Sequence, residues 1–441
     1  MEHAPERIDL NEIANFRGPG EVPRVAEMAG RLVGSEILKI AAAIRELKAS
    51  GADVCDLTVG DFDPAIFPIP APLLAGVQEA LAGGETNYPP SSGILELREA
   101  VQRFYERELG LAYPLASVLV AGGARPLIYG TYRTVVDPGD KVVYPVPSWN
   151  NNHYVTMLGA DPVAVVCGPE TRFLPEPEAL IRELGGARLV CLNSPLNPTG
   201  TAITEDGLGT ICEAILAENR AREGRGERPL YLLYDHIYWM LTFGETRHVT
   251  PPGLFPEMAR YTIFIDGISK AFAATGLRVG WGVGPVDVMQ RMNAVIGHVG
   301  AWAPRPEQKA SARLLDDPAA IRSYHAVFKE GISTRLELLH RGIQGLKTDG
   351  LPVESIPPMG AIYLTAQIAP FGRKTPDGEV LRTNEEVRRY LLDRAAIGLV
   401  PFQAFGVPGD HGWFRLSVGA ASIDAIEAAL PRLRAALEAL E

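Results

Sequence analysis

At residues 266–280 the chain reads Asp-Gly-Ile-Ser-Lys-Ala-Phe-Ala-Ala-Thr-Gly-Leu-Arg-Val-Gly, directly after an apolar run, Tyr261 to Ile265, that is typical of a strand. A small turn follows the strand and presents Lys270, with Arg278 eight residues further on. A nearby cation lowers the pKa of a lysine amine, and a guanidinium can clamp a phosphate. Because a lone loop lysine is usually a surface residue, the interpretation depends on the other motifs.

Three further motifs stand at or near the ends of apolar runs. Asn193-Ser194-Pro195-Leu196-Asn197-Pro198-Thr199-Gly200 follows one such run, and Asp235-His236-Ile237-Tyr238 follows another. Phe414-Arg415-Leu416-Ser417 stands near the C-terminus. In parallel sheets ligands bind at the carboxyl ends of the strands, so the motifs that end strands are predicted to share one site.

The ordered set of motifs resembles the fold-type I aminotransferases of class I/II, which are similar to aspartate aminotransferase. The resemblance runs from about Ile37 to the last helix and so covers nearly the whole chain. It implies a pyridoxal 5'-phosphate cofactor, bound as a Schiff base to a lysine. It also implies a homodimer with shared active sites.

Composition excludes several other classes of protein. The 441 residues are 46% apolar, enough for two domains, and the net charge of −11 argues against nucleic acid or an anionic membrane as partner. The four cysteines have no metal-ligand spacing, so no metal is expected. Residues 1–30 have no signal-peptide pattern and no run of 18 apolar residues occurs, which makes a cytoplasmic protein the expectation.

Short apolar runs alternate with helical patterns, which indicates an α/β fold with a mostly parallel seven-stranded sheet covered on both faces. The predicted strands are Val118–Ala121, Val142–Tyr144, Val163–Val166, Ala187–Leu192, Leu230–Tyr234, Tyr261–Ile265 and Val279–Val283. We expect residues 61–305 to form the large cofactor-binding domain and residues 306–441 a smaller α+β domain. Residues 1–60, a polar arm followed by a helix and a strand over 54–59, are expected to join the small domain.

The resemblance assigns roles around the cofactor ring. Lys270 would form the imine and carry the proton. Asp235, at the end of an apolar strand, would pair with the pyridinium nitrogen and so avoid an unpaired buried charge. Tyr238 and Asn197 would donate to the phenolic oxygen, and Trp149 would stack on the ring; the alternatives are a helix cap for Asp235, a turn residue for Asn197 and a core tryptophan.

The cofactor phosphate needs several donors. The segment Gly122-Gly123-Ala124-Arg125 links a strand to a helix, so the backbone N–H groups of Gly123, Ala124 and Arg125 would form an anion site. Arg278 would add a charged fork. By resemblance Tyr88 would reach the phosphate of the partner subunit, although an ordinary buried tyrosine is the alternative.

Substrate recognition is implied for Arg415, which matches the arginine that binds the α-carboxylate, with Gly60 and Asn197 beside it. The chain departs from the family pattern at Gly267, where a hydroxyl residue is common, and at His236, where many relatives have glutamate. A solvated or supporting role is expected for His236. Arg305 is interpreted as a surface salt-bridge residue, with binding of an acidic side chain as the alternative.

Three functions fit these motifs. The first is an aminotransferase that exchanges an amino group between an L-amino acid and a 2-oxo acid in a ping-pong reaction. The second is a lyase or synthase on the same fold, such as a carbon–sulfur β-lyase. The third is the effector domain of a transcription regulator, for which thirty polar residues before Arg31 are too few to form a DNA-binding domain.

Overall fold

The computed structural model describes residues 10, 14, 25–32, 34, 36–49 and 51–441. Within them, the largest sheet has seven strands in the order β2-β8-β7-β6-β5-β3-β4. Their bounds are β2 Val118–Ala121, β3 Lys141–Val146, β4 Asp161–Val166, β5 Ala187–Asn193, β6 Tyr231–Asp235, β7 Thr262–Gly267 and β8 Gly280–Val283. Only β8 runs against its neighbours β2 and β7, so the carboxyl ends of the other strands lie at one edge, which confirms the mostly parallel sheet.

Helices cover both faces of this sheet because successive strand residues point to opposite sides. On β6, Leu232 and Tyr234 enter one apolar cluster and Leu233 enters another. The first cluster includes residues of α5 (Leu95–Leu109), α9 (Glu205–Arg225) and α13 (Arg305–Leu315). The second includes residues of α6 (Ala124–Val135), α7 (Asn151–Leu158) and α12 (Val286–Val299). Five further helices are described in the connections: α2 Glu27–Arg31, α4 Ala71–Ala82, α8 Pro177–Ile181, α10 Pro251–Leu254 and α11 Ile268–Ala271.

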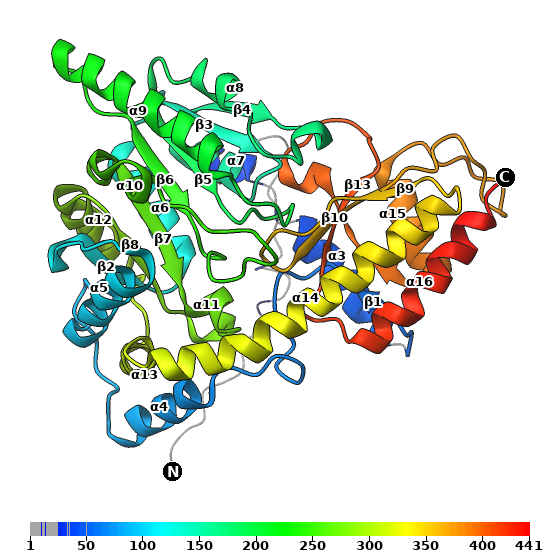
Figure 1. The fold of residues 1–441 in the computed structure, drawn as a ribbon, viewed down its shortest axis with the longest axis horizontal. Helices are drawn as coiled ribbons and strands as arrows, with labels where there is room; N and C mark the ends of the chain where they lie inside the picture. The colour runs from blue at the N-terminus through cyan, green and yellow to red at the C-terminus, as the bar shows by residue number, and fades with distance from the viewer. Residues whose placement is uncertain (1–9, 11–13, 15–24, 33, 35, 50) are drawn as a thin grey trace.

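A smaller α+β body lies beside the large sheet (Figure 1). Its antiparallel sheet, as far as the chain is described, has the order β12-β13-β10-β9. The bounds are β9 Val353–Ser355, β10 Tyr363–Ile368, β12 Val400–Pro401 and β13 Trp413–Ser417, with helices α15 Asn384–Ala395 and α16 Ile423–Glu438. The long helix α14 (Pro318–Thr348) runs from α13 to β9 and so joins the two bodies (Figure 1).

The N-terminal segment contacts this smaller body. After α3 (Glu36–Ala49) comes β1 (Cys55–Asp56), which pairs in parallel with β11 (Ile397–Gly398). The strand is shorter than the predicted 54–59, and directly after it the Asp56 carboxylate accepts hydrogen bonds from the amide and hydroxyl of Thr58. We propose the domain division 1–60, 61–305 and 306–441, which this pairing supports.

The polar arm predicted for residues 1–30 lies outside the described residues except at positions 10, 14 and 25–30. Across the part of the chain that is described, no helix is both long enough and apolar enough to cross a membrane.

Candidate active site

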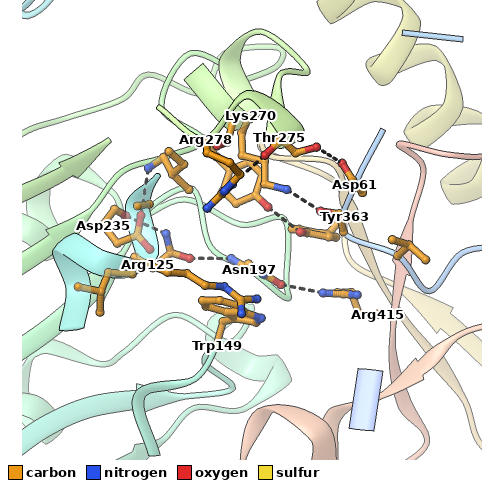
Figure 2. Close-up of a pocket in the computed structure, with 18 residues that line it drawn as sticks. Asp61, Arg125, Trp149, Asn197, Asp235, Lys270, Thr275, Arg278, Tyr363 and Arg415 are labelled. Atoms are coloured by element: carbon orange, nitrogen blue, oxygen red, sulfur yellow. Dashed lines mark hydrogen bonds between the residues drawn. The ribbon is translucent and has the colours of Figure 1, made fainter. Parts of the chain in front are cut away.

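A cavity of about 300 Å³ opens at the carboxyl edge of the large sheet, where the smaller body meets it (Figure 2). Ten of the twelve predicted site residues line it: Gly60, Ala124, Arg125, Trp149, Asn197, Asp235, Tyr238, Lys270, Arg278 and Arg415. They come from the connections after β1, β2, β3, β5, β6 and β7 and from β13. Strand direction therefore gathers residues that are far apart in sequence, as predicted.

Lys270 stands in α11, one short turn beyond β7, and its side chain enters the cavity. The amine donates to the carbonyl oxygen of Gly60 at 2.5 Å. Burial is the main cause that lowers the pKa of Lys270 to about 8; the positive charges of Arg415, Arg125 and Arg278 contribute to this shift, and the negative charge of Asp61 opposes it. A sizeable fraction of neutral, nucleophilic amine is therefore available near neutral pH.

Asp235 is the last residue of β6, and its carboxylate accepts the Ile237 amide at 3.1 Å. Burial raises the pKa of Asp235 to about 6. Its backbone carbonyl accepts from the Asn193 side-chain amide at 2.7 Å, and the Asn193 side-chain oxygen accepts from the Asn197 amide at 2.8 Å. These bonds tie the β5 loop to the end of β6, and a carboxylate held in this way suits a cationic ring nitrogen.

The first turn of α6 faces Arg278. Arg278 donates to the carbonyl oxygens of Thr275 at 2.7 Å and Gly122 at 3.1 Å. Gly123 has φ +95°, and a Cβ on it would lie 2.3 Å from the Arg278 guanidinium, so only glycine fits here. Gly123 does not line the cavity but forms the cap of α6, whose first N–H groups have no partner within the helix. This donor set suits a phosphate.

Trp149 lies in the loop after β3 and borders the cavity. The Arg125 guanidinium stacks on its ring, 4.4 Å from the ring centroid (Figure 2). The Arg125 side chain thus enters the site as well as its backbone, which the sequence interpretation did not foresee. Stacking on an indole orients a guanidinium while leaving its N–H groups open to a ligand.

Arg415 on β13 is 1% exposed. Its guanidinium donates to Asn197 Oδ1 at 3.1 Å and to the Thr58 carbonyl, and it lies 4.7 Å from the ring centroid of Tyr363. Within the described residues its Nε–H has no hydrogen-bond partner. A buried charge with an open donor favours binding of a carboxylate.

Sequence reasoning missed three residues that the structure brings into the site. Tyr363 on β10 shares a 2.6 Å hydrogen bond with the Tyr238 hydroxyl, and Thr275 donates to Asp61 at 2.6 Å. A Cβ on Gly60 would lie 2.6 Å from the Tyr363 hydroxyl, which explains why this position has a residue without a side chain. Tyr363 begins a strand and belongs to none of the motifs, so no local signal marked it. Asp61 stands in a turn-like sequence, which gives no sign of a role in the site.

Two predicted or considered residues lie outside the cavity. Tyr88 is 84% exposed, and its ring packs edge-on against Trp302 with centroids 5.5 Å apart. Arg305 pairs with Glu85, as the salt-bridge interpretation expects. Tyr88 is therefore placed where another molecule can contact it and not where it can serve the cavity of its own chain.

The two departures from the family pattern have structural explanations. A Cβ on Gly267 would lie 2.7 Å from the Val279 carbonyl oxygen, so the close approach of β7 and β8 leaves no room for a hydroxyl side chain. Ser269 and Thr275 line the cavity instead. His236 is fully buried, which rules out the solvated alternative.

In the described residues no group of three or more His, Cys, Asp or Glu could hold a metal ion.

A model of the family described as aminotransferase class I and II matches residues 52–433. The chain belongs to this family. It is 31% identical over 409 residues to the aspartate aminotransferase of Rhizobium meliloti strain 1021, covering 92% of this chain and 94% of that one. It is 33% identical over 377 residues to a probable aspartate/prephenate aminotransferase of Thermus aquaticus, with 84% and 90% covered.

Solved structures agree with this assignment to the class I and II aminotransferases. The crystal structure of the Rhizobium meliloti aspartate aminotransferase superposes with a TM-score of 0.85 at 30% identity, covering 96% of this chain and all of the other. The Thermus thermophilus aspartate aminotransferase with maleate gives 0.83 at 27% identity, with 94% and 100% covered. The enzyme is a pyridoxal-phosphate-dependent aminotransferase, which confirms the first of the three functions.

Proposed function

We propose that the cavity is the aminotransferase active site, with Lys270, Asp235 and Arg415 as its central groups. The observation that carries this proposal is their convergence on one cavity with the pKa of Lys270 lowered to about 8. Bound pyridoxal phosphate supplies a carbonyl carbon that accepts the amino group and a ring that accepts electrons. The protein supplies binding, orientation and proton transfer.

Each residue then has a defined task. Lys270 would hold the cofactor through its amine and, as a neutral amine, would move the proton of the substrate α-carbon. Asp235 keeps the ring nitrogen protonated. Tyr238 and Asn197 donate to the phenolic oxygen and Trp149 covers the ring. Arg278 and the N-terminal turn of α6, from Gly123 to Arg125, hold the phosphate.

Arg415 binds the substrate α-carboxylate, with Gly60 and Asn197 beside it, and aspartate is the proposed amino donor. Arg415 is one of four cationic side chains among the described residues that line the cavity, and it is the one assigned to the substrate carboxylate. The names of the relatives from Rhizobium meliloti and Thermus aquaticus support the same substrate.

The active unit is a homodimer in which Tyr88 of each chain reaches the cofactor phosphate of the other. The exposure of the Tyr88 ring supports this, because tyrosine is enriched at protein–protein interfaces relative to the rest of the surface. The enzyme works in the cytoplasm, a location supported by four cysteines that are all free and buried.

Spectroscopy of the half-reactions tests the function. Aspartate alone should change the absorbance of the bound cofactor, and a 2-oxo acid added afterwards should restore it. Lys270→Ala should lose both this cycle and turnover, because no other amine lines the cavity among the described residues. Release of pyruvate and ammonia from one substrate would instead indicate a lyase, and an active Lys270→Ala variant would contradict the site.

A further inference from the structure

A second set of polar groups lies buried near the carboxyl ends of β6 and β7, on the face of the sheet that packs against α5. Its centre is Asp266, which is 1% exposed and stands next to last in β7. Tyr105 from α5 and His236, which directly follows β6, are buried to the same degree. The proposed reaction uses none of these side chains, although an isolated buried carboxylate is costly.

Three donors surround the Asp266 carboxylate. One oxygen accepts the amide of Gly267 at 2.7 Å. The other accepts the indole N–H of Trp239 at 3.0 Å and the hydroxyl of Tyr105 at 3.4 Å. No arginine or lysine shares in these bonds, so Asp266 depends on neutral donors. Losing any one of them would destabilise its charged form.

The network continues from Tyr105 through two histidines. The Tyr105 hydroxyl lies 2.8 Å from His236 Nε2, and His236 Nδ1 lies 3.2 Å from His248 Nε2. Burial, and then the charge of His248, hold the pKa of His236 well below its usual value, so the ring is neutral. Where the Tyr105 hydroxyl donates to Asp266, His236 Nε2–H is the donor to Tyr105, and His248 Nε2–H is then the donor to His236 Nδ1, because each neutral ring carries one N–H. Among the described residues His248 Nδ1 has no partner, in accord with this order.

Both ends of the network adjoin proposed active-site residues. His236 is bonded covalently to Asp235, and its own amide donates to the Ile265 carbonyl at 3.2 Å. At the other end, the Gly267 amide held by Asp266 is the first peptide of the turn that presents Lys270. The network thus joins the residue after Asp235 to the turn before Lys270.

We propose that Asp266, Tyr105 and His236 form a positioning network. It fixes Lys270 and Asp235 relative to one another from the face of the sheet that packs against α5. The inference rests on the proposed roles of those two residues. Its physical basis is that small displacements of catalytic groups reduce the rate strongly, and that fully satisfied buried hydrogen bonds restrict such displacements.

Tyr105→Phe tests the network, with Tyr113→Phe as the matched control. Both hydroxyls are buried in the same cluster, and both rings pack on Phe264, but the Tyr113 hydroxyl has no partner among the described residues. Tyr105→Phe should lower kcat roughly fivefold or more with little change in KM, because positioning and not binding is lost. Tyr113→Phe should leave kcat unchanged.

The pH profile separates positioning from simple destabilisation. Burial is the main cause that raises the pKa of Asp266 to about 7; the hydrogen bonds from Gly267, Trp239 and Tyr105 oppose this shift, and the charge of Asp235 adds to it. Besides these groups, His236 and His248 face the network. Removing the Tyr105 hydroxyl should raise the Asp266 pKa, so the acidic limb of the kcat profile should move to higher pH by about half a unit. The midpoint of the pH-dependent absorbance of the bound cofactor should also move.

A second pair of variants covers the case in which Tyr105→Phe folds poorly. His236→Gln keeps a donor directed at Tyr105 and should retain most of kcat, whereas His236→Leu should lose it. A lowered Tm with unchanged kcat, pH profile and cofactor absorbance in Tyr105→Phe or His236→Leu would overturn the positioning proposal alone. A Lys270→Ala variant that kept the pH-dependent absorbance would overturn both this proposal and the proposed site.

Discussion

Asp235 and Lys270 are both held in environments that disfavour their charged forms. For Asp235, burial raises the pKa from 3.8 to about 6, and for Lys270 it lowers the pKa from 10.5 to about 8. Perturbed pKa values of this kind cluster at functional sites because a reactive group needs a protonation state that water does not favour. The protein therefore gives up some stability at these two positions.

Replacing Asp235 with Asn in the cofactor-free protein tests how much folding stability the buried carboxylate costs. The folded state binds the Asp235 proton more tightly than the unfolded state does, so stability falls as pH rises from about 4 to about 6 and then stays low. Asp235→Asn should therefore be more stable than wild type at pH 8, by on the order of 3 kcal/mol, and equal to it near pH 3. Thermal unfolding at several pH values measures this.

The same variant should lose several orders of magnitude in transamination rate, because an amide does not hold a ring nitrogen protonated. Equal stabilisation at pH 3 and pH 8 would show that the effect comes from packing and not from charge. A loss of rate below about tenfold would show that Asp235 is a structural cap.

Arg415→Ala should weaken all amino-acid substrates together, since each carries an α-carboxylate. The expected loss in kcat/KM corresponds to about 2–5 kcal/mol for a buried charged pair. Arg305→Ala is the control, because Arg305 pairs with Glu85 away from the cavity. If aspartate alone were affected by Arg415→Ala, the arginine would bind the side-chain carboxylate instead.

At the scale of secondary-structure elements, the site depends on how closely β7 and β8 approach. Gly267 ends β7, and its hydrogen atoms face Gly280 and the Val279 carbonyl, where a Cβ would lie at 2.8 and 2.7 Å. The hydroxyl residue that the family often has at this position cannot enter without moving backbone. The close contact of Gly267 with Val279 and Gly280 thus explains why this chain lacks the hydroxyl residue that could have donated to the phosphate.

Gly267→Ser should therefore destabilise the enzyme in place of adding a phosphate contact. Overpacking against backbone costs about 1–3 kcal/mol, which lowers the unfolding temperature by a few degrees in a chain of this size. Gly276→Ala is the matched control, since nothing lies within 4 Å of the added Cβ. Tighter cofactor binding with unchanged stability in Gly267→Ser would contradict this explanation.

At the scale of the whole molecule, one chain supplies a nearly complete cavity but leaves Tyr88 in solvent. The proposed homodimer accounts for both facts, because a residue that serves the partner site must be exposed in the isolated chain. It also makes each active site composite, with Lys270 from one chain and Tyr88 from the other.

Subunit mixing tests the composite site. Lys270→Ala and Tyr88→Ala are each expected to be inactive or weakly active alone. In a mixed dimer one site carries both lesions and the other carries neither, so activity should rise toward about a quarter of wild type when half of the dimers are mixed. No recovery after demonstrated subunit exchange would mean that Tyr88 serves its own chain.

Much of the fold and of the site was predictable because the signals are local. Apolar strands that end in polar motifs indicate a parallel sheet. In such a sheet the carboxyl ends of β5, β6 and β7 lie at the same edge, and this does not depend on how individual side chains pack. Asn197, Asp235 and Lys270 therefore line one cavity as predicted. The resemblance added the cofactor, which the family membership confirms.

Other features depend on contacts between distant segments, which no local pattern encodes. The sequence alone determined the sheet, the family and the residues at the strand ends, since these follow from hydrophobic periodicity and short motifs. Only the tertiary structure decided that Tyr363 contacts Tyr238, that Gly267 has no room for a side chain, and that His236 is buried beside Tyr105. The reason is that close packing and hydrogen-bond partners depend on which side chains come into contact in the folded chain. In the pairs Tyr238–Tyr363 and Tyr105–His236, the two residues are more than a hundred positions apart in the sequence.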